Sequence, residues 1–201
     1  MAEQIRAVVP TDCQLPVEIH CQDEARFGLK TTRRRRITAR GVKPIGTCQH
    51  AYANTWVYGT VAPASGDAFA LILPKLNTTN MQVFIDAFAR AYPSTFNVLL
   101  LDNSAVHTTE RLRLPVNVAL VFLPPYSPEL NPVERLWQDL RDRLAWRVFD
   151  DLEGLQAELC IQLDHYTPAV VQSLTSYPYL RRAIDEIGPF PHATKIAEPS
   201  N

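Results

Sequence analysis

An aspartate and a histidine follow a segment with the composition of a buried strand. Residues 96–101 are almost continuously apolar, which is typical of a strand covered on both faces. Asp102 comes directly after this run, and His107 lies in the same connection, where mixed sheets place their ligands. The motif is therefore a candidate site. The alternative interpretation is an Asp that caps a following short helix, with His107 on the surface.

A proline-rich segment, LPPYSPELNPVERLW at residues 123–137, carries another candidate carboxylate. Asn131 suits a helix N-cap, and Pro132 suits the first helical position. Glu134 then falls in the first turn, next to an apolar stripe formed by Val133, Leu136, Trp137, Leu140 and Leu144. Glu134 is either a functional carboxylate or the partner of Asn131 in a capping box, and spacing alone favours the capping box.

A third acid lies in an alternating segment near the start of the chain. Residues 17–22 read VEIHCQ, a period of two that predicts a strand with one buried face. Asp23 continues the register of Ile19 and Cys21, so we expect its carboxylate on the inward face.

Together these segments resemble the three catalytic blocks of a known family. The sequences DEARF (23–27), LDNSAVH (101–107) and LPPYSPELNPVE (123–134) are similar to those of bacterial insertion-sequence transposases of the mariner superfamily, in their DDE endonuclease domain. The resemblance covers residues 17–185. It implies an α/β, RNase H-like fold: a mixed β-sheet flanked by α-helices. It also implies that Asp23, Asp102 and Glu134 are the catalytic and metal-binding acids. The 31 residues between the last two fit the family's short interval.

The implied activity is metal-dependent cleavage and strand transfer of double-stranded DNA, at element ends and in target DNA. Two Mg²⁺ ions about 4 Å apart, or Mn²⁺ in their place, stabilise the attacking and leaving oxygens in such reactions. Mg²⁺ prefers carboxylate oxygens, which three converging acids would supply. Two alternatives stay open: an RNase H-like nuclease without strand transfer, and a non-catalytic DNA-binding or dimerisation remnant of a truncated transposase.

One feature of the family has no counterpart in this sequence. Full members resemble an N-terminal helix-turn-helix region joined to this catalytic core, whereas the chain starts shortly before its first expected strand. We therefore expect either a helix-turn-helix polypeptide from an upstream frame as partner or a truncated chain. A homodimer is a further expected partner.

A strongly basic segment follows Asp23. Residues 24–43 hold eight cations and one acid, a formal charge of +7, whereas the whole chain carries −1. We expect a loop or hairpin tip whose Arg33, Arg34, Arg35, Arg36 and Lys43 contact DNA phosphates. A solvated loop is the alternative. Asn103, His107 and Asn131 are expected to orient the second carboxylate or to contact DNA.

The remaining patterns predict the elements that must position these residues. We expect strands at 17–22, 46–62, 67–73, 96–101 and 116–123, and helices from an N-cap in 77–80 to Tyr92, at 132–148, at 152–163 and at 180–187. Strands followed by helices predict a mixed sheet with helices on its faces. The expected organisation is a short extension (1–16), one catalytic domain (17–187) and a disordered tail (188–201).

Composition and charge exclude several classes of protein. With 46% hydrophobic residues the chain is not wholly disordered, and a net charge of −1 excludes a uniformly basic DNA-binding protein. No apolar run suits a signal peptide or membrane span, so we expect a cytoplasmic protein, associated with the bacterial nucleoid when bound to DNA. The four cysteines are expected to be free thiols. A zinc site from His20, Cys21, Cys48 and His50 is disfavoured, because adjacent strand residues point to opposite faces.

Overall fold

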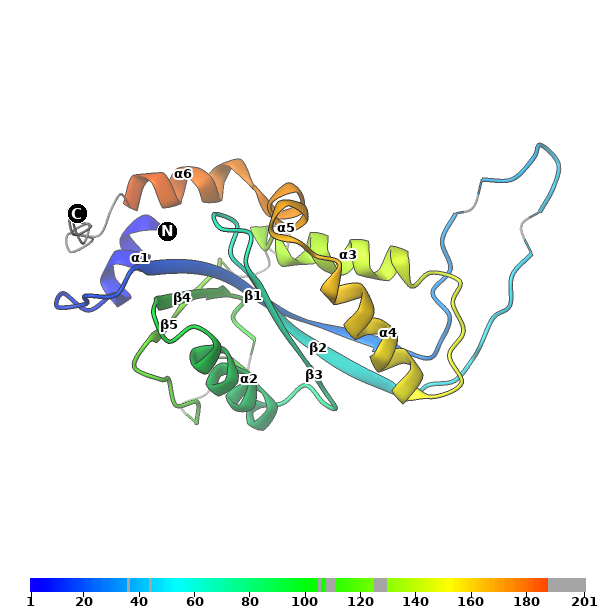
Figure 1. Ribbon diagram of the computed structural model, residues 1–201, viewed down its shortest axis with the longest axis horizontal. Helices are drawn as coiled ribbons and strands as arrows, with labels where there is room; N and C mark the ends of the chain where they lie inside the picture. Colours follow the sequence, from blue (N-terminus) through cyan, green and yellow to red (C-terminus); the bar gives the residue numbers. More distant parts are fainter. Residues whose placement is uncertain (36, 44, 105, 108–110, 125–129, 188–201) are drawn as a thin grey trace, which may run out of the picture.

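The computed structural model describes residues 1–187 except 36, 44, 105, 108–110 and 125–129 (Figure 1). The expected disordered tail therefore lies outside the described residues. The elements in chain order are α1 (Ala2–Val8), β1 (Val17–Gly28), β2 (Asn54–Val61), β3 (Ala68–Leu73), α2 (Thr78–Ala91), β4 (Phe96–Leu101), β5 (Val118–Phe122), α3 (Val133–Arg143), α4 (Leu152–Asp164), α5 (Pro168–Thr175) and α6 (Pro178–Ile187).

The five strands form one mixed sheet in the order β3-β2-β1-β4-β5. The central strand β1 pairs antiparallel with β2 and parallel with β4. The mixed sheet that the sequence predicts is thus confirmed. All six residues of β4 are buried, in agreement with its apolar composition.

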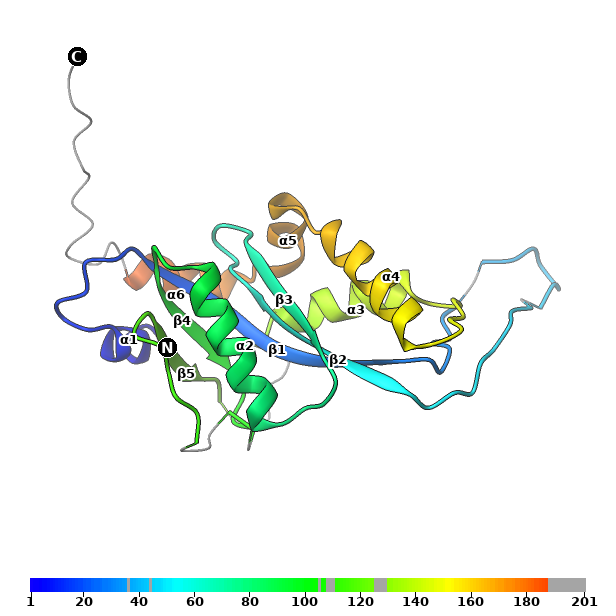
Figure 2. The ribbon, with the colours of Figure 1, turned by 60° about the horizontal axis from the view of Figure 1, so that its bottom comes forward.

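Helices cover both faces of the sheet (Figures 1 and 2). On one face α2 packs its Phe84 and Phe88 against a cluster that includes Tyr58, Leu99 and Leu101. On the other face, residues of α1, α3, α4, α5 and α6 join Ile19, Cys21, Ala25 and Phe27 of β1 in a second cluster. None of the described helices is long and apolar enough to cross a bilayer.

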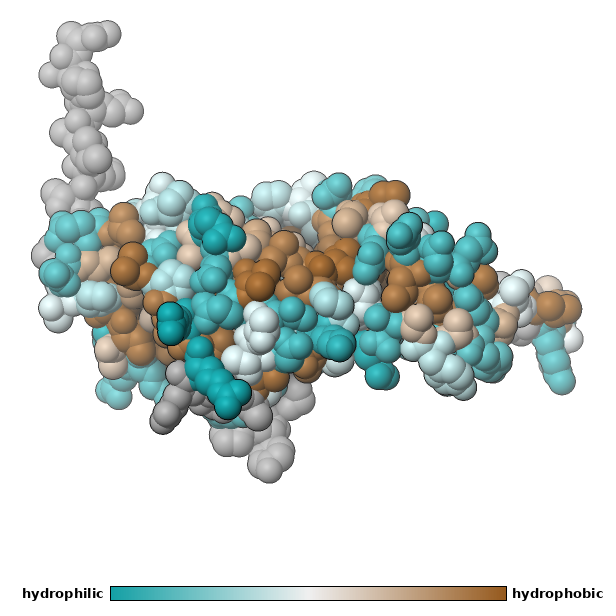
Figure 3. Space-filling model, turned by 90° about the horizontal axis from the view of Figure 1, so that it is seen from below, coloured by the Kyte–Doolittle hydropathy of each residue, from teal (hydrophilic) through white to brown (hydrophobic). Residues whose placement is uncertain are grey.

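The edge strand β3 is the least covered part of the sheet. Its sequence is AFALIL, and its side chains are only partly buried. The hydrophobic area in the upper middle of Figure 3 lies over this strand.

Two strand boundaries differ from the prediction. The strand β1 continues to Gly28, so the expectation of a loop from Glu24 is wrong; Ala25 and Phe27 extend the buried alternation while the intervening Arg26 is exposed. The strand β2 begins at Asn54, whereas we expected strand from residue 46. The segment 29–53 is here called the arm, and its described residues, 29–35, 37–43 and 45–53, instead project beyond the sheet (Figure 1).

Two helices were not predicted. Ile5 of α1 is buried in the core, so part of the expected extension packs on the domain. The helix α5 begins at Pro168 and buries Val171. Both helices are short and bury few residues, which leaves no clear 3.6-residue period in the sequence.

The base of the arm is attached to the domain by backbone hydrogen bonds. Leu29 N donates to Ala53 O at 3.0 Å, and Thr31 N donates to Gln49 O at 3.2 Å. Trp146 N donates to Thr32 O at 2.9 Å, and Trp146 has a positive φ of 64°. This left-handed residue lies in the connection after α3, which ends at Arg143 and not at the predicted residue 148.

The packing of α3 on the sheet depends on a glycine. Gly59 lies opposite Asp23 in the β1–β2 pair, and the Trp137 ring lies over it. A Cβ at Gly59 would lie 2.6 Å from Trp137 Cη2, closer than carbon atoms normally approach. The absent side chain therefore allows the fully buried Trp137 to cross the sheet at this point.

Gly59→Ala should consequently destabilise the domain by about 1–3 kcal/mol, the usual effect of overpacking a filled core. Urea unfolding measures this change. Gly154→Ala is the matched control, because its Cβ would meet only Asp151 Oδ1 at 3.4 Å. Its helical position favours Ala by up to about 1 kcal/mol. Equal stability of the Gly59→Ala variant and the parent would contradict this account.

Candidate active site

Asp23 lies in the central strand, on the face that α3 covers. Trp137 Nε1 donates a hydrogen bond to Asp23 Oδ2 at 3.0 Å. The neighbours of Asp23 on the same face of β1, Cys21 and Ala25, are each 1% exposed. Asp23 is thus a carboxylate held within an apolar core face, as the alternation of residues 17–22 predicts.

This position raises the pKa of Asp23 to about 7. Burial is the main cause, and repulsion from the carboxylates of Glu24 and Glu134 adds to it. Hydrogen bonds from the Glu24 backbone and from Trp137 oppose the change. The site therefore concentrates negative charge that a cation would stabilise.

Glu134 lies in the first turn of α3, one turn before Trp137. Its side chain is exposed, and within the described part of the chain it makes no hydrogen bond to the Asn131 backbone. The capping-box interpretation is thus not observed. Pro132 is the N-cap residue, where we expected Asn131, and the helix begins at Val133.

Asn131 connects the start of α3 to β1. Its Nδ2 donates to Gln22 O at 2.8 Å, and its Oδ1 accepts from Val133 N at 3.2 Å. Asn131 is 4% exposed. This residue therefore fixes the first turn of α3, and with it Glu134, next to the residue before Asp23.

Asp102 directly follows β4, beside β1. In the parallel pair Cys21 is opposite Leu100, and the same register continued by two residues sets Asp23 next to Asp102. The Asp102 side chain is 61% exposed. Its Oδ1 accepts from Ser104 N at 3.0 Å. Asn103 Nδ2 donates to Leu123 O at 3.0 Å, which ties the ends of β4 and β5 together.

His107 connects Asp102 to a second acid. Its Nδ1 lies 2.8 Å from Asp102 Oδ1, and its Nε2 lies 2.9 Å from Glu24 Oε1. Burial alone lowers the pKa of His107, but the hydrogen bond and charge of Glu24, together with Asp102, raise it to about 9. A carboxylate beside each ring nitrogen therefore favours the imidazolium form of His107, which can donate from both nitrogens.

Glu24 is a site residue that the sequence analysis missed. Its side chain is 5% exposed, and it also accepts from Gln22 Nε2 at 2.8 Å. The signal was present in the alternation, since His20, Gln22 and Glu24 form a polar series on the β1 face opposite Asp23. Asp23 and Glu24, adjacent in β1, thus lie on opposite faces of the sheet.

The oxygen donors of the site suit a hard divalent cation. As they stand, however, no three His, Cys, Asp or Glu side chains among the described residues are close enough together to hold a metal ion. Asp102 is engaged by His107, while the charge of Glu134 acts on Asp23. Convergence of all three acids on a metal stays a prediction.

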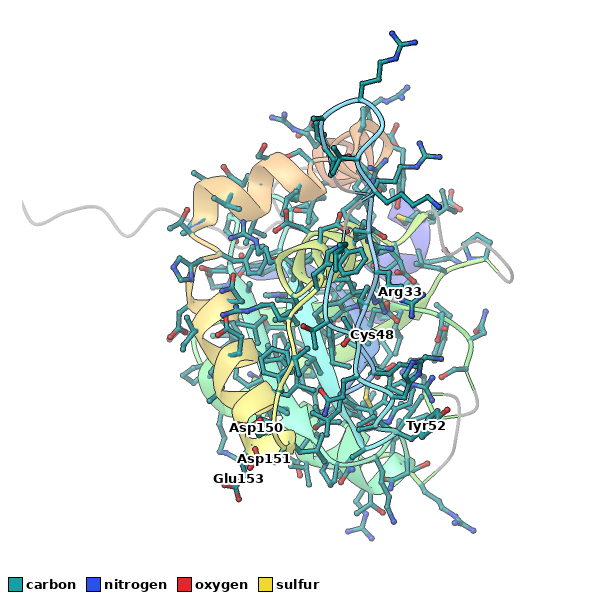
Figure 4. All side chains as sticks on the ribbon, turned by 90° about the vertical axis from the view of Figure 1, so that its right-hand side faces the viewer. Arg33, Cys48, Tyr52, Asp150, Asp151 and Glu153 are labelled. Carbon is teal, nitrogen blue, oxygen red and sulfur yellow. The ribbon has the colours of Figure 1, made fainter. Side chains whose placement is uncertain are left out.

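The basic residues of the arm have mixed surroundings. Arg33 Nη2 donates to Cys48 Sγ at 3.1 Å, and Figure 4 labels both residues. Arg34 pairs with Asp142 of α3, and its carbonyl accepts from Trp146 Nε1 at 3.0 Å. Arg35 and Lys43 are exposed. Arg36 lies outside the described residues. Arg34 therefore also attaches the arm to the domain.

The four residues considered as zinc ligands, His20, Cys21, Cys48 and His50, do not form a metal-binding cluster among the described residues. His20 and Cys21 are buried in β1, and burial raises the pKa of the Cys21 thiol. Cys48 Sγ lies 3.8 Å from His50 Nε2 on the arm. All four cysteines are free thiols, as expected.

Comparison with known proteins identifies a family whose sequence model matches this chain. The sequence model of the family described as "DDE superfamily endonuclease" matches residues 18–156, a span that contains all three acids. The "Uncharacterized protein y4pE/y4sA" of Sinorhizobium fredii (strain NBRC 101917 / NGR234) is 39% identical over 107 residues. That match covers 52% of this chain and 79% of that protein.

Solved structures of Mos1 transposase have a similar fold. Its paired-end complex with the left transposon end matches with a TM-score of 0.65 and 19% identity, over 85% of this chain and 55% of that chain. The Mos1 mariner paired end complex with Mn matches with a TM-score of 0.65 and 17% identity, over 92% and 57%. The chain thus spans about half the length of these proteins. At such identities the likeness establishes the fold, which is RNase H-like as expected.

The pKa of Asp23 predicts how stability depends on pH. Its folded value of about 7 exceeds the ordinary 3.8, so ionisation destabilises the fold progressively from about pH 4 to pH 7. Asp23→Asn removes this effect and still accepts from Trp137. We expect the variant to exceed the parent in stability by about 2–4 kcal/mol at pH 8 and to match it near pH 4.

Urea unfolding in metal-free buffer at both pH values measures the difference. Asp164→Asn, at an exposed position at the end of α4, is the control and should follow the parent at both. A difference between the Asp23→Asn variant and the parent that does not grow with pH would refute the assignment.

Proposed function

Because this chain belongs to the DDE superfamily endonucleases, we propose that it is the catalytic domain of a transposase that cleaves DNA and transfers the cut strand. Asp23, Asp102 and Glu134 are the proposed catalytic acids. One observation carries the proposal: β1 and β4 pair in parallel up to Cys21 and Leu100, two residues before Asp23 and Asp102, and Asn131 and Trp137 attach α3 to β1 on either side of Glu134. The mariner-type bacterial insertion sequence is the proposed source.

Each acid has its own support. Asp23 is held by Trp137, and Glu134 is positioned through Asn131. Asp102 is oriented by Ser104 N and His107. A carboxylate held in this way loses little conformational freedom when it binds a ligand.

We propose that these three carboxylates hold Mg²⁺ or Mn²⁺, as a pair of ions. Their oxygens and the uncompensated charge at Asp23 fit a hard cation. The ions would stabilise charge on the attacking and leaving oxygens at phosphorus. The chain's own contribution is to fix the carboxylates and to keep Asp23 within an apolar wall.

Double-stranded DNA is the proposed partner. The Mos1 structures are described as complexes with a transposon end, and this chain has their fold. Exposed Arg35 and Lys43, with Arg33, Arg34 and Arg36, are the proposed phosphate contacts of the arm. A helix-turn-helix polypeptide and a second copy of the chain are further proposed partners.

A non-catalytic DNA-binding module is the second candidate function. The observation that favours it is the engagement of Asp102 by His107, which leaves no three-residue metal cluster among the described residues. A nuclease that hydrolyses DNA without strand transfer differs from the main proposal only in its nucleophile, which is always water and never a DNA 3′-hydroxyl.

Metal binding should be visible without DNA. Saturating Mg²⁺ or Mn²⁺ at pH 8 should raise the melting temperature of the parent by several degrees, because a ligand at about 100 times its Kd stabilises by about 2.7 kcal/mol. Asp23→Asn and Glu134→Gln should lose most of this increase. Asp164→Asn should keep it. An equal increase in all four proteins would indicate non-specific ion binding.

Nicking of supercoiled plasmid tests the catalytic role. The parent should nick in Mg²⁺ or Mn²⁺ but not in EDTA, and Asp102→Asn or Glu134→Gln should reduce the rate on the order of 10²–10³-fold. Glu153→Gln, at an exposed position in the first turn of α4, is the control. Capture of a labelled 3′-hydroxyl end would identify strand transfer. DNA binding without nicking would favour the second candidate.

A further inference from the structure

We infer that a pocket at the base of the arm binds one backbone phosphate of the DNA on which the catalytic acids act; this inference rests on the proposed function. The pocket has a volume of about 240 Å³. It lies where the end of β1, the start of β2 and the connection between α3 and α4 meet. None of its lining residues belongs to the Arg33–Arg36 run.

The lining is cationic without a carboxylate. Arg26, Lys30, Arg141 and Arg147 contribute to it, and none of the described residues that line it is acidic. Arg147 pairs with Glu158. For Arg26, Lys30 and Arg141, no carboxylate partner occurs in the described part of the chain. Figure 4 shows the nearby acids Asp150, Asp151 and Glu153 on one side of this end of the molecule and Tyr52, a pocket residue, on the other. The pocket therefore has the charge of an anion site.

The floor of the pocket is fixed before any ligand binds. Phe27 is 5% exposed and meets the Trp137 ring edge to face at 6.4 Å between centroids. Thr31 Oγ1 accepts from Gln49 N at 2.9 Å, and Gln49 Oε1 accepts from Phe149 N at 3.3 Å. Such bonds hold the arm, β1 and the α3–α4 connection in one arrangement. A site that is already ordered binds with a smaller entropic penalty.

The arginine side chains of the pocket favour a phosphate over a base as the ligand. Arg141 lies over the Phe27 ring at 5.6 Å, and Arg147 lies over the Phe149 ring at 5.9 Å. A guanidinium group thus covers one face of each of these two rings, and Phe27 is only 5% exposed, which makes both rings poor platforms for base stacking. The third aromatic residue of the described lining, Tyr52, is exposed. The guanidinium forks, in contrast, match the oxygens of a phosphate.

The pocket and the acids lie along the same two elements. Phe27 follows Asp23 by four residues in β1, about 13 Å at the usual strand rise. Arg141 follows Glu134 by seven residues on the same side of α3, about 10 Å. Both separations correspond to about three to four base-pair steps of duplex DNA. A duplex that reaches the acids can therefore place a neighbouring phosphate in the pocket.

The test compares two variants of equal charge. Lys30→Gln combined with Arg141→Gln removes two pocket cations, whereas Lys75→Gln combined with Arg90→Gln removes two exposed cations from the α2 side. Binding of a short labelled duplex of random sequence is measured by fluorescence anisotropy at several salt concentrations in EDTA. The pocket variant should bind more weakly, and its salt slope should fall by about 0.9, the value for one phosphate contact. The control pair should keep the parent's slope.

Two further variants separate charge from folding. Arg141→Lys keeps the charge and should keep the slope. Arg26→Gln removes a pocket charge without disturbing Phe27 and should lower the slope if the double variant melts early. Equal slopes in the pocket and control pairs, or no DNA binding by the parent, would overturn the inference. DNA binding is measured in EDTA, which prevents cleavage, so the two proposals can fail separately. If the parent does not nick plasmid but the pocket variant still shows the selective loss of salt slope, the pocket inference stands and only the proposed activity is contradicted.

Discussion

The hydrogen bond between Trp137 and Asp23 depends on how closely α3 approaches the central strand. A buried indole can reach the carboxylate only because Gly59 has no side chain where the ring crosses β2. Asn131 fixes the other end of the same approach through its bond to Gln22 O. With both points fixed, the backbone of Glu134 is held close to Asp23, and the charge of Glu134 raises the pKa of Asp23. The electrostatics of the site thus follow from the packing of one helix.

Most of the fold could be predicted where the burial of an element leaves a clear pattern in its own sequence, on both faces for β4 and on one side for α3. The run of β4 and the stripe of α3 have periods that survive in the sequence, and Asn77 caps α2 as its type suggests. The ends of β1 and β2 could not be predicted, because the basic composition of residues 24–43 suggests a loop while the pairing with β2 continues the strand to Gly28. Pairing partners distant along the chain decide such boundaries.

The candidate site was predictable to a similar extent. Asp23, Asp102 and Glu134 stand in recognisable segments, and the local spacing of Glu134 suggested a cap that the structure does not contain. The link from Glu24 through His107 to Asp102 could not be predicted, since it joins residues 83 positions apart. The pair of Arg34 and Asp142 was hidden for the same reason, at a separation of 108 residues. The charge composition of a segment indicates that it will attract opposite charges, but it does not identify the residue with which each charge pairs.

The way in which the arm is closed also affects how the domain tolerates change. Hydrogen bonds between residues 29–31 and 49–53 bring both ends of the arm together, and Trp146 holds its first residues. Beyond these bonds and the contact of Arg34 with Asp142, added chain length raises the closure entropy only logarithmically, by about 0.6 kcal/mol for each doubling. We therefore expect changes in the length of the arm beyond Arg34 to leave the sheet and the three acids in place. The arm is consequently the part of the domain that can diverge in length at the least cost to the arrangement of Asp23, Asp102 and Glu134.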